Sequence, residues 1–165
     1  MRYFIVQTQP SFDGRVEITG WKDKINRKWL NPEQLYRIPD KIVLSVTTGE
    51  YLPLPDFIVT PFLLGACSVH HVIRLYGDTV YTRNVILIDH ERNMVKQYYL
   101  LVPERLEEGG APLRERNFFW MDAGGERKTV VSLAFAESIL RRGVTGISLE
   151  ETEVTEKGGS GNVRS

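Results

Sequence analysis

Short runs of apolar residues, separated by polar and glycine-containing segments, predict a chain built mainly of strands. Tyr3–Thr8 mixes aromatic and β-branched residues, and Lys41–Thr47 is a second β-branched run. Pro53 and Pro55 keep the next segment extended, because a residue that precedes proline is pushed out of the α region. This segment leads into a predicted strand over Asp56–Val59.

A hairpin is the clearest pattern in the middle of the chain. Val80–Ile88 and Met94–Val102 are both rich in strand-forming residues, and the polar segment Asp89–Asn93 between them has the length of a hairpin connection. A further strand is predicted over Arg114–Met121, where charged and aromatic residues alternate before the break at Asp122–Gly125.

A hydroxyl residue followed by an apolar stripe predicts a first helix that begins after Thr60. The Thr60 side chain can accept a hydrogen bond from a free N–H of the first turn, and Pro61 has no N–H that would need a partner. Apolar positions then recur at helical spacing as far as the break at Gly77-Asp78. These positions are Phe62, Leu63, Ala66, Cys67, Val69 and Ile73.

The same logic predicts a second helix near the C-terminus. Val130-Val131 runs into Ser132, which is a good N-cap, and Gly143 supplies the left-handed residue that ends many helices. A strand is predicted from Gly146 to Val154. The expected core-facing positions of the helix are Leu133, Phe135, Ala136, Ile139 and Leu140.

The remaining segments are predicted to be irregular. Ser11–Pro39 reads as a long connection with one helical turn at Pro32–Tyr36, and Pro103–Pro112 as a solvated loop. From Thr155 the composition is too polar and glycine-rich to pack. We therefore expect one α+β domain over residues 1–154 with a mixed, mostly antiparallel sheet, two short capped helices and a long irregular N-terminal connection. Residues 155–165 are expected to form a disordered tail.

Composition narrows the range of partners. The 165 residues carry 21 Lys plus Arg and 21 Asp plus Glu, so no global field attracts nucleic acid or an anionic membrane. There is one cysteine, which excludes an internal disulfide, and no apolar run is long enough to span a bilayer. The N-terminus lacks the pattern of a signal peptide. We expect a cytoplasmic protein, and free strand edges in a small sheet are compatible with a homodimer.

Candidate chemistry in the sequence is sparse. Cys67 and His71 would lie one helical turn apart, and with His70 or His90 they could form a small-ligand or metal site. The competing interpretation is a buried, apolar Cys67 beside surface histidines. The glutamate clusters at Glu104–Glu108 and Glu150–Glu153 read as solvated surface. None of the Gly-rich phosphate-binding, zinc-protease or serine-hydrolase motifs is present. We expect neither an enzyme nor a cofactor.

The segment Trp21–Trp29 places four cations between two tryptophans. This composition is typical of a surface that stacks single-stranded nucleic acid, and equally of a protein-interface hot spot. The balanced charge of the chain favours protein contact. Tryptophans that simply belong to the core are an equal alternative.

Four segments together resemble one bacterial family. They are Pro55–Thr60, Tyr98–Val102, Val130-Val131-Ser132 and Arg142–Glu150. In this order they are similar to the immunity proteins of polymorphic toxin systems, in the group numbered eleven and forty-three, a former domain of unknown function. The likeness extends over Met1–Val154 and is closest in the C-terminal unit, whereas Ser11–Pro39 matches no pattern of the family.

This resemblance implies a non-catalytic inhibitor that binds a cognate toxin domain and masks its active site or substrate surface. Aromatic and basic residues would anchor such an interface, although each aromatic is equally compatible with a core position. The candidate partner-binding residues are Trp21, Lys22, Lys24, Arg27, Lys28, Trp29, Tyr36, Phe118 and Trp120.

Overall fold

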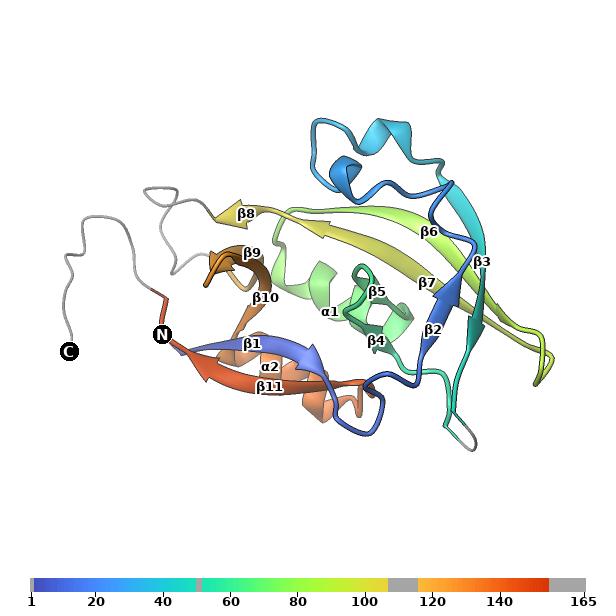
Figure 1. Cartoon of the computed structure of the whole chain (residues 1–165). Coiled ribbons are helices and arrows are strands. Elements are labelled where there is room, and N and C mark those ends of the chain that lie inside the picture. The colour runs from blue at the N-terminus through green and yellow to red at the C-terminus, as the bar shows by residue number, and fades with distance from the viewer. Residues whose placement is uncertain (1, 50–51, 107–115, 155–165) are drawn as a thin grey trace.

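Two mixed β-sheets form the framework of the computed structural model, which describes residues 2–49, 52–106 and 116–154 (Figure 1). The predicted tail at 155–165 and most of the predicted loop at 103–112 lie outside the described residues. The α+β class and the single domain are confirmed, with the strands divided between two sheets.

The first sheet pairs the two ends of the described chain. Its order is β11-β1-β10-β9-β8, in which β8 and β9 are parallel and the other neighbours are antiparallel. The predicted opening strand is confirmed as β1. The strands are β1 (Tyr3–Thr8), β8 (Arg105–Leu106), β9 (Phe118–Ala123), β10 (Glu126–Ser132) and β11 (Ile147–Thr152).

The second sheet is built around the predicted hairpin, which is confirmed. Its order is β2-β3-β6-β7-β5-β4, in which only β3 and β6 are parallel. At the hairpin turn the Asp89 carboxylate accepts the N–H groups of Glu91 and Arg92 at 3.1 and 3.2 Å. The strands are β2 (Glu17–Thr19), β3 (Lys41–Thr47), β4 (Phe57–Ile58), β5 (Leu64–Gly65), β6 (Val80–Asp89) and β7 (Met94–Pro103).

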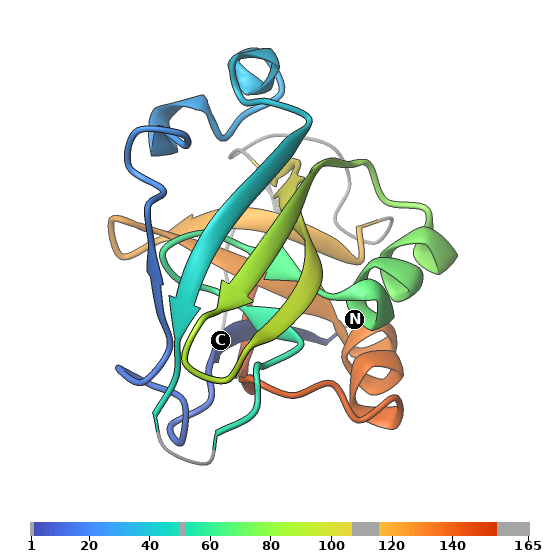
Figure 2. The same ribbon diagram turned by 90° about the vertical axis from the view of Figure 1, so that its right-hand side faces the viewer.

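The helices α1 (Cys67–Tyr76) and α2 (Leu133–Arg141) lie side by side, as Figure 2 shows. The Tyr76 hydroxyl links them by donating to the carbonyl of Ala134 at 2.8 Å. No helix in the described part of the chain is long and apolar enough to cross a membrane.

The predicted start of the first helix is wrong. Leu64 and Gly65 pair with Leu100 and Tyr99 as β5, and α1 begins only at Cys67. The strand pairing satisfies backbone groups of the sheet, and this tertiary gain outweighs the local helix-start signal at Thr60-Pro61. The end of α1 at Gly77, with φ +73°, agrees with the predicted break.

The second helix begins and ends as predicted. Ser132 Oγ accepts the N–H of Phe135 at 3.2 Å, and Gly143 is left-handed with φ +68°. Its buried face differs in two positions, because Leu140 is 59% exposed and Leu133 is only half-buried. The buried residues of α2 are Phe135, Ala136 and Ile139.

The long N-terminal connection contains more structure than its sequence indicates. It holds the short strand β2 and two 3-10 turns, η1 (Arg27–Trp29) and η2 (Leu35–Arg37), which form the blue turns at the top of Figure 1. The second turn overlaps the end of the predicted one. Ile25, Leu30, Leu35 and Ile38 are all buried, so the connection is fixed to the core at regular intervals.

Candidate binding surface and cleft

The first part of the N-terminal connection holds its aromatic and basic side chains in defined positions. Asn26 caps η1 by accepting the N–H of Lys28 at 2.9 Å. The ring of Trp21 packs edge-on against Phe62, with centroids 5.5 Å apart. The Arg27 guanidinium lies over Trp21, 5.1 Å from the ring centroid.

The second part repeats this arrangement with other residues. Arg37 lies over both Trp29 and Tyr36, at 5.8 and 5.7 Å from their ring centroids, and Tyr36 is 72% exposed. From below, Arg83 donates hydrogen bonds to the carbonyls of Leu35 and Ile38 at 3.1 and 3.0 Å, which fixes the backbone of this turn.

Most of the predicted partner-binding residues therefore lie on one ordered segment of the surface. Trp21 and Trp29 are half-buried, and the other members are exposed. Together with Arg37, which lies over Trp29 and Tyr36, we call these residues the basic surface. It consists of Trp21, Lys22, Lys24, Arg27, Lys28, Trp29, Tyr36 and Arg37.

Two predicted anchors belong to the core instead. Phe118 is 1% exposed and stacks on Phe135, with ring centroids 5.3 Å apart and planes at 4°. It lies in β9, whose start is held because the Asp78 carboxylate accepts the N–H groups of Asn117 and Phe118. A buried ring cannot anchor a partner, so the prediction is corrected for Phe118.

Trp120 is also largely buried, at 6% exposure, but it borders a cleft. The Arg127 guanidinium lies over its ring at 4.4 Å from the centroid. Trp120 can therefore act only as part of the cleft lining and not as a protruding anchor.

The cleft has a volume of about 820 Å³ and lies between the first sheet, the η1 turn and the Val59–Leu63 segment. Arg27 and Lys28 line it from the η1 side, and Arg127 lines it from β10. Phe62 and Trp120 contribute apolar surface. The cleft thus combines cations from two separate parts of the chain with aromatic rings, and it is continuous with the basic surface through Arg27 and Lys28.

Strand alternation decides which β10 side chains face the cleft. Thr129 is paired with Trp120 on one side and with Val6 on the other, so these three share one sheet face. Arg127, two residues away, shares that face. Lys128 and Glu126 belong to the opposite face, where their side chains form an ion pair at 2.8 Å.

Arg127 is in an unusual electrostatic position. Partial burial lowers its pKa, the nearby charge of Arg105 lowers it further, and Asp122 acts in the opposite direction. Asp122 is itself paired with Arg105. Among the residues that the structure describes, no carboxylate forms an ion pair with Arg27, Lys28 or Arg127. The guanidinium retains its charge and can accept an external anion.

The predicted metal-ligand set is not brought together. Cys67 is exposed, which corrects the alternative expectation of a buried thiol, and His70 stacks on Tyr99 with ring centroids 4.0 Å apart. Burial and the charge of Arg74 lower the pKa of His70. His90 lies in the β6–β7 turn near Ser45, and from the turn to Tyr99 the strand runs about 17 Å. Over residues 2–49, 52–106 and 116–154, no three His, Cys, Asp or Glu residues form a group able to hold a metal ion.

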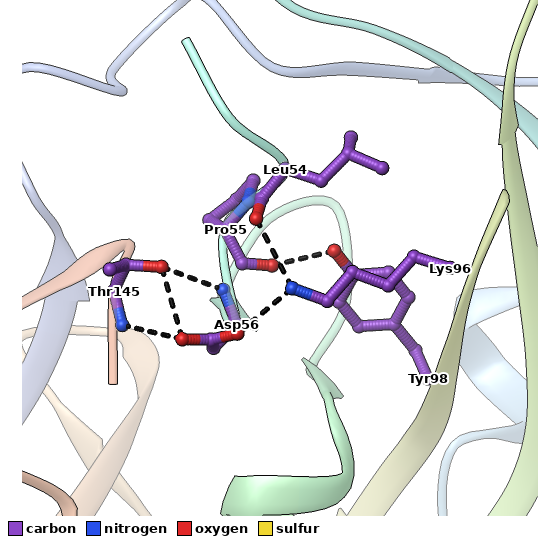
Figure 3. Close-up of polar contacts among 6 residues, drawn as sticks. All are labelled: Leu54, Pro55, Asp56, Lys96, Tyr98 and Thr145. Atoms are coloured by element: carbon purple, nitrogen blue, oxygen red, sulfur yellow. Dashed lines mark hydrogen bonds and ion pairs between the residues drawn. The ribbon is translucent and has the colours of Figure 1, made fainter. Parts of the chain in front are cut away.

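A polar cluster around Asp56 joins the two sheets (Figure 3). Asp56 pairs with Lys96 at 2.8 Å and accepts both the N–H and the hydroxyl of Thr145 at 3.1 and 3.2 Å. Burial raises the pKa of Asp56, but hydrogen bonds from Lys96 and Thr145 outweigh it and leave the pKa below its ordinary value. Beside it, the buried Tyr98 hydroxyl donates to the Pro55 carbonyl at 2.6 Å. These groups are hydrogen-bond partners of one another, so we assign the cluster a structural role in holding the two sheets together.

No protein-family model matches the sequence, and the curated proteins include no significant match.

Proposed function

We propose that this protein is an immunity protein that binds a cognate bacterial toxin domain and neutralises it by protein–protein contact, without catalysis. The observation that supports this proposal is the basic surface, where exposed cations and aromatic side chains are held on a backbone that is fixed to the core. Tryptophan, tyrosine and arginine are the residues that most often dominate the binding energy of protein interfaces.

The arginine–aromatic stacks favour a protein partner. Arg27 and Arg37 are placed over aromatic rings, so less side-chain entropy is lost when they meet a partner. Tyr36 offers a large exposed ring beside them. A specific interface buries about 800 Å² of each partner. The basic surface and the adjoining cleft are continuous through Arg27 and Lys28, so both can take part in one interface.

Co-expression with the product of the neighbouring gene tests the proposal. We expect the neighbour to be toxic when expressed alone, growth to be restored by this protein, and the two proteins to purify as a complex. The variants Trp29→Ala and Tyr36→Ala should each weaken the complex about tenfold or more, because each removes a candidate anchor.

Tyr81→Ala is the matched control. Tyr81 is an exposed tyrosine on β6, 43% accessible and outside the basic surface, and its truncation should leave binding unchanged. A neighbour that is harmless and forms no complex would reject the immunity function. A complex that tolerates both Trp29→Ala and Tyr36→Ala would reject the basic surface as the interface.

A further inference from the structure

Within the described residues, the cations of the cleft form no ion pair with a carboxylate that faces it. Arg27 and Lys28 approach from η1, and Arg127 from β10. The carboxylate among the described lining residues is Glu126, which belongs to the other sheet face and is held by Lys128. A ligand of complementary charge is therefore anionic.

The shape of the cleft indicates an extended ligand. A second cavity of about 320 Å³ shares Leu30, Trp120 and Arg127 with the cleft, so the two cavities adjoin at the Arg127–Trp120 stack. We call the two together the groove. The second cavity also contains Arg105, Glu104 and Glu33, so its charges are more balanced. A single small anion would occupy only part of such a groove.

Two arginines of the groove are held over aromatic rings in positions suited to bind carboxylates. The Arg127 guanidinium lies over Trp120 and that of Arg27 over Trp21. A guanidinium stacked on an aromatic ring can still offer its N–H edge to a carboxylate in a bidentate contact. Arg127 is exposed, so a ligand can reach it from solvent. Phe62 and Trp120 offer apolar contact between these charges.

We propose that the groove is the docking site for an extended acidic segment of the partner protein. Arg127, Arg27 and Lys28 bind its carboxylates, and Trp120 and Phe62 pack against an apolar residue between them. The proposal rests on the protein-binding function proposed above and adds the chemistry of the partner.

Selection from a library of short random peptides tests the groove independently of which toxin the protein binds. Immobilised protein should enrich peptides that combine Asp or Glu with an aromatic or aliphatic residue, and their binding should weaken as the salt concentration rises. A selected peptide should bind Arg127→Gln about tenfold or more weakly, and Lys28→Gln should show a loss in the same direction.

Arg141→Gln is the matched control, since it removes an exposed cation at the end of α2 that lines neither cavity; peptide affinity should stay unchanged. If Arg127→Gln does not fold, as judged by thermal unfolding, Lys28→Gln decides the outcome. The proposal is overturned if the enriched peptides are not acidic or if Arg141→Gln loses as much affinity as the groove variants. It is also overturned if ATP binds at Arg127 and displaces the peptides at lower concentration. Failure of toxin neutralisation would reject the function above but would leave this peptide result standing.

Discussion

At the scale of single residues, Asp56 links the two sheets through its carboxylate. Its carboxylate joins Lys96 of β7 to Thr145, which precedes β11. We expect Asp56→Asn to lower the free energy of unfolding by about 1–2 kcal/mol at neutral pH, because charge-assisted hydrogen bonds are lost and Lys96 loses its counter-charge. Urea denaturation of both proteins measures this difference.

The pH dependence of that difference has a definite sign. The pKa of Asp56 is lower in the folded protein than its ordinary value of 3.8, so its contribution to stability is complete above that value and is lost as the pH falls through the folded pKa. The two proteins should therefore differ at about pH 7 and converge only as the pH falls through the lowered pKa of folded Asp56. Glu151→Gln, which alters the exposed pair with Arg2, should have a much smaller effect. Equal effects of the two substitutions would contradict the stabilising role of the Asp56 contacts.

The sequence indicates the basic surface but not the cleft. Trp21, Trp29 and the cations between them are visible as a local composition, and this segment is ordered and exposed. Arg127 is not marked by any local pattern, because its importance comes from the pairing of β10 with β9, which places it over Trp120. Phe118 and Trp120 look like surface aromatics for the same reason: their burial depends on which strands and helices cover them.

At the scale of secondary-structure elements, the turn before β11 depends on a glycine. Gly146 has φ +104°, and a Cβ there would lie 2.4 Å from the Phe57 carbonyl oxygen and 2.6 Å from Pro55 Cβ. We expect Gly146→Ala to destabilise the protein by about 3 kcal/mol or more, because the first and second sheets approach each other here through backbone atoms that cannot move aside. The thermal midpoint measures the effect.

Gly143→Ala separates the two causes. Gly143 is also left-handed, with φ +68°, but no atom lies within 4 Å of its Cβ position, so its substitution should cost only about 1–2 kcal/mol. If both variants lose the same stability, the close approach at Gly146 contributes nothing and backbone conformation alone explains the loss.

The two predicted helix starts show where local signals suffice. Ser132 is both the last residue of β10 and the N-cap of α2, so the sheet and the helix do not compete for it, and the prediction is correct. Thr60-Pro61 offers an equally good cap, but Leu64 and Gly65 downstream are used by the second sheet. Helix propensity over such a short segment amounts to a few tenths of a kcal/mol per residue, less than the loss of a strand pairing.

At the scale of the whole molecule, the two sheets differ in the sequence distance that they join. The β6–β7 hairpin pairs residues close in the chain, whereas β1 pairs with β11, as in the Tyr3–Thr152 pair. Long loop closure is entropically costly, so we expect the hairpin to form before the first sheet. Val85→Ala in β6 should mainly slow folding, and Val6→Ala in β1 should mainly accelerate unfolding. Stopped-flow kinetics in urea measures both, and the reverse pattern would contradict this order.

The antiparallel pairing of β1 with β11 also places the start of β1 beside the end of β11. Because Tyr3 is opposite Thr152, a short linker can connect these two strands without crossing the domain. The exposed β6–β7 turn can then receive the new ends. A protein circularly permuted in this way would retain both sheets and the cleft. Its new termini would lie at His90 and Glu91 in the β6–β7 turn, where another protein could be fused.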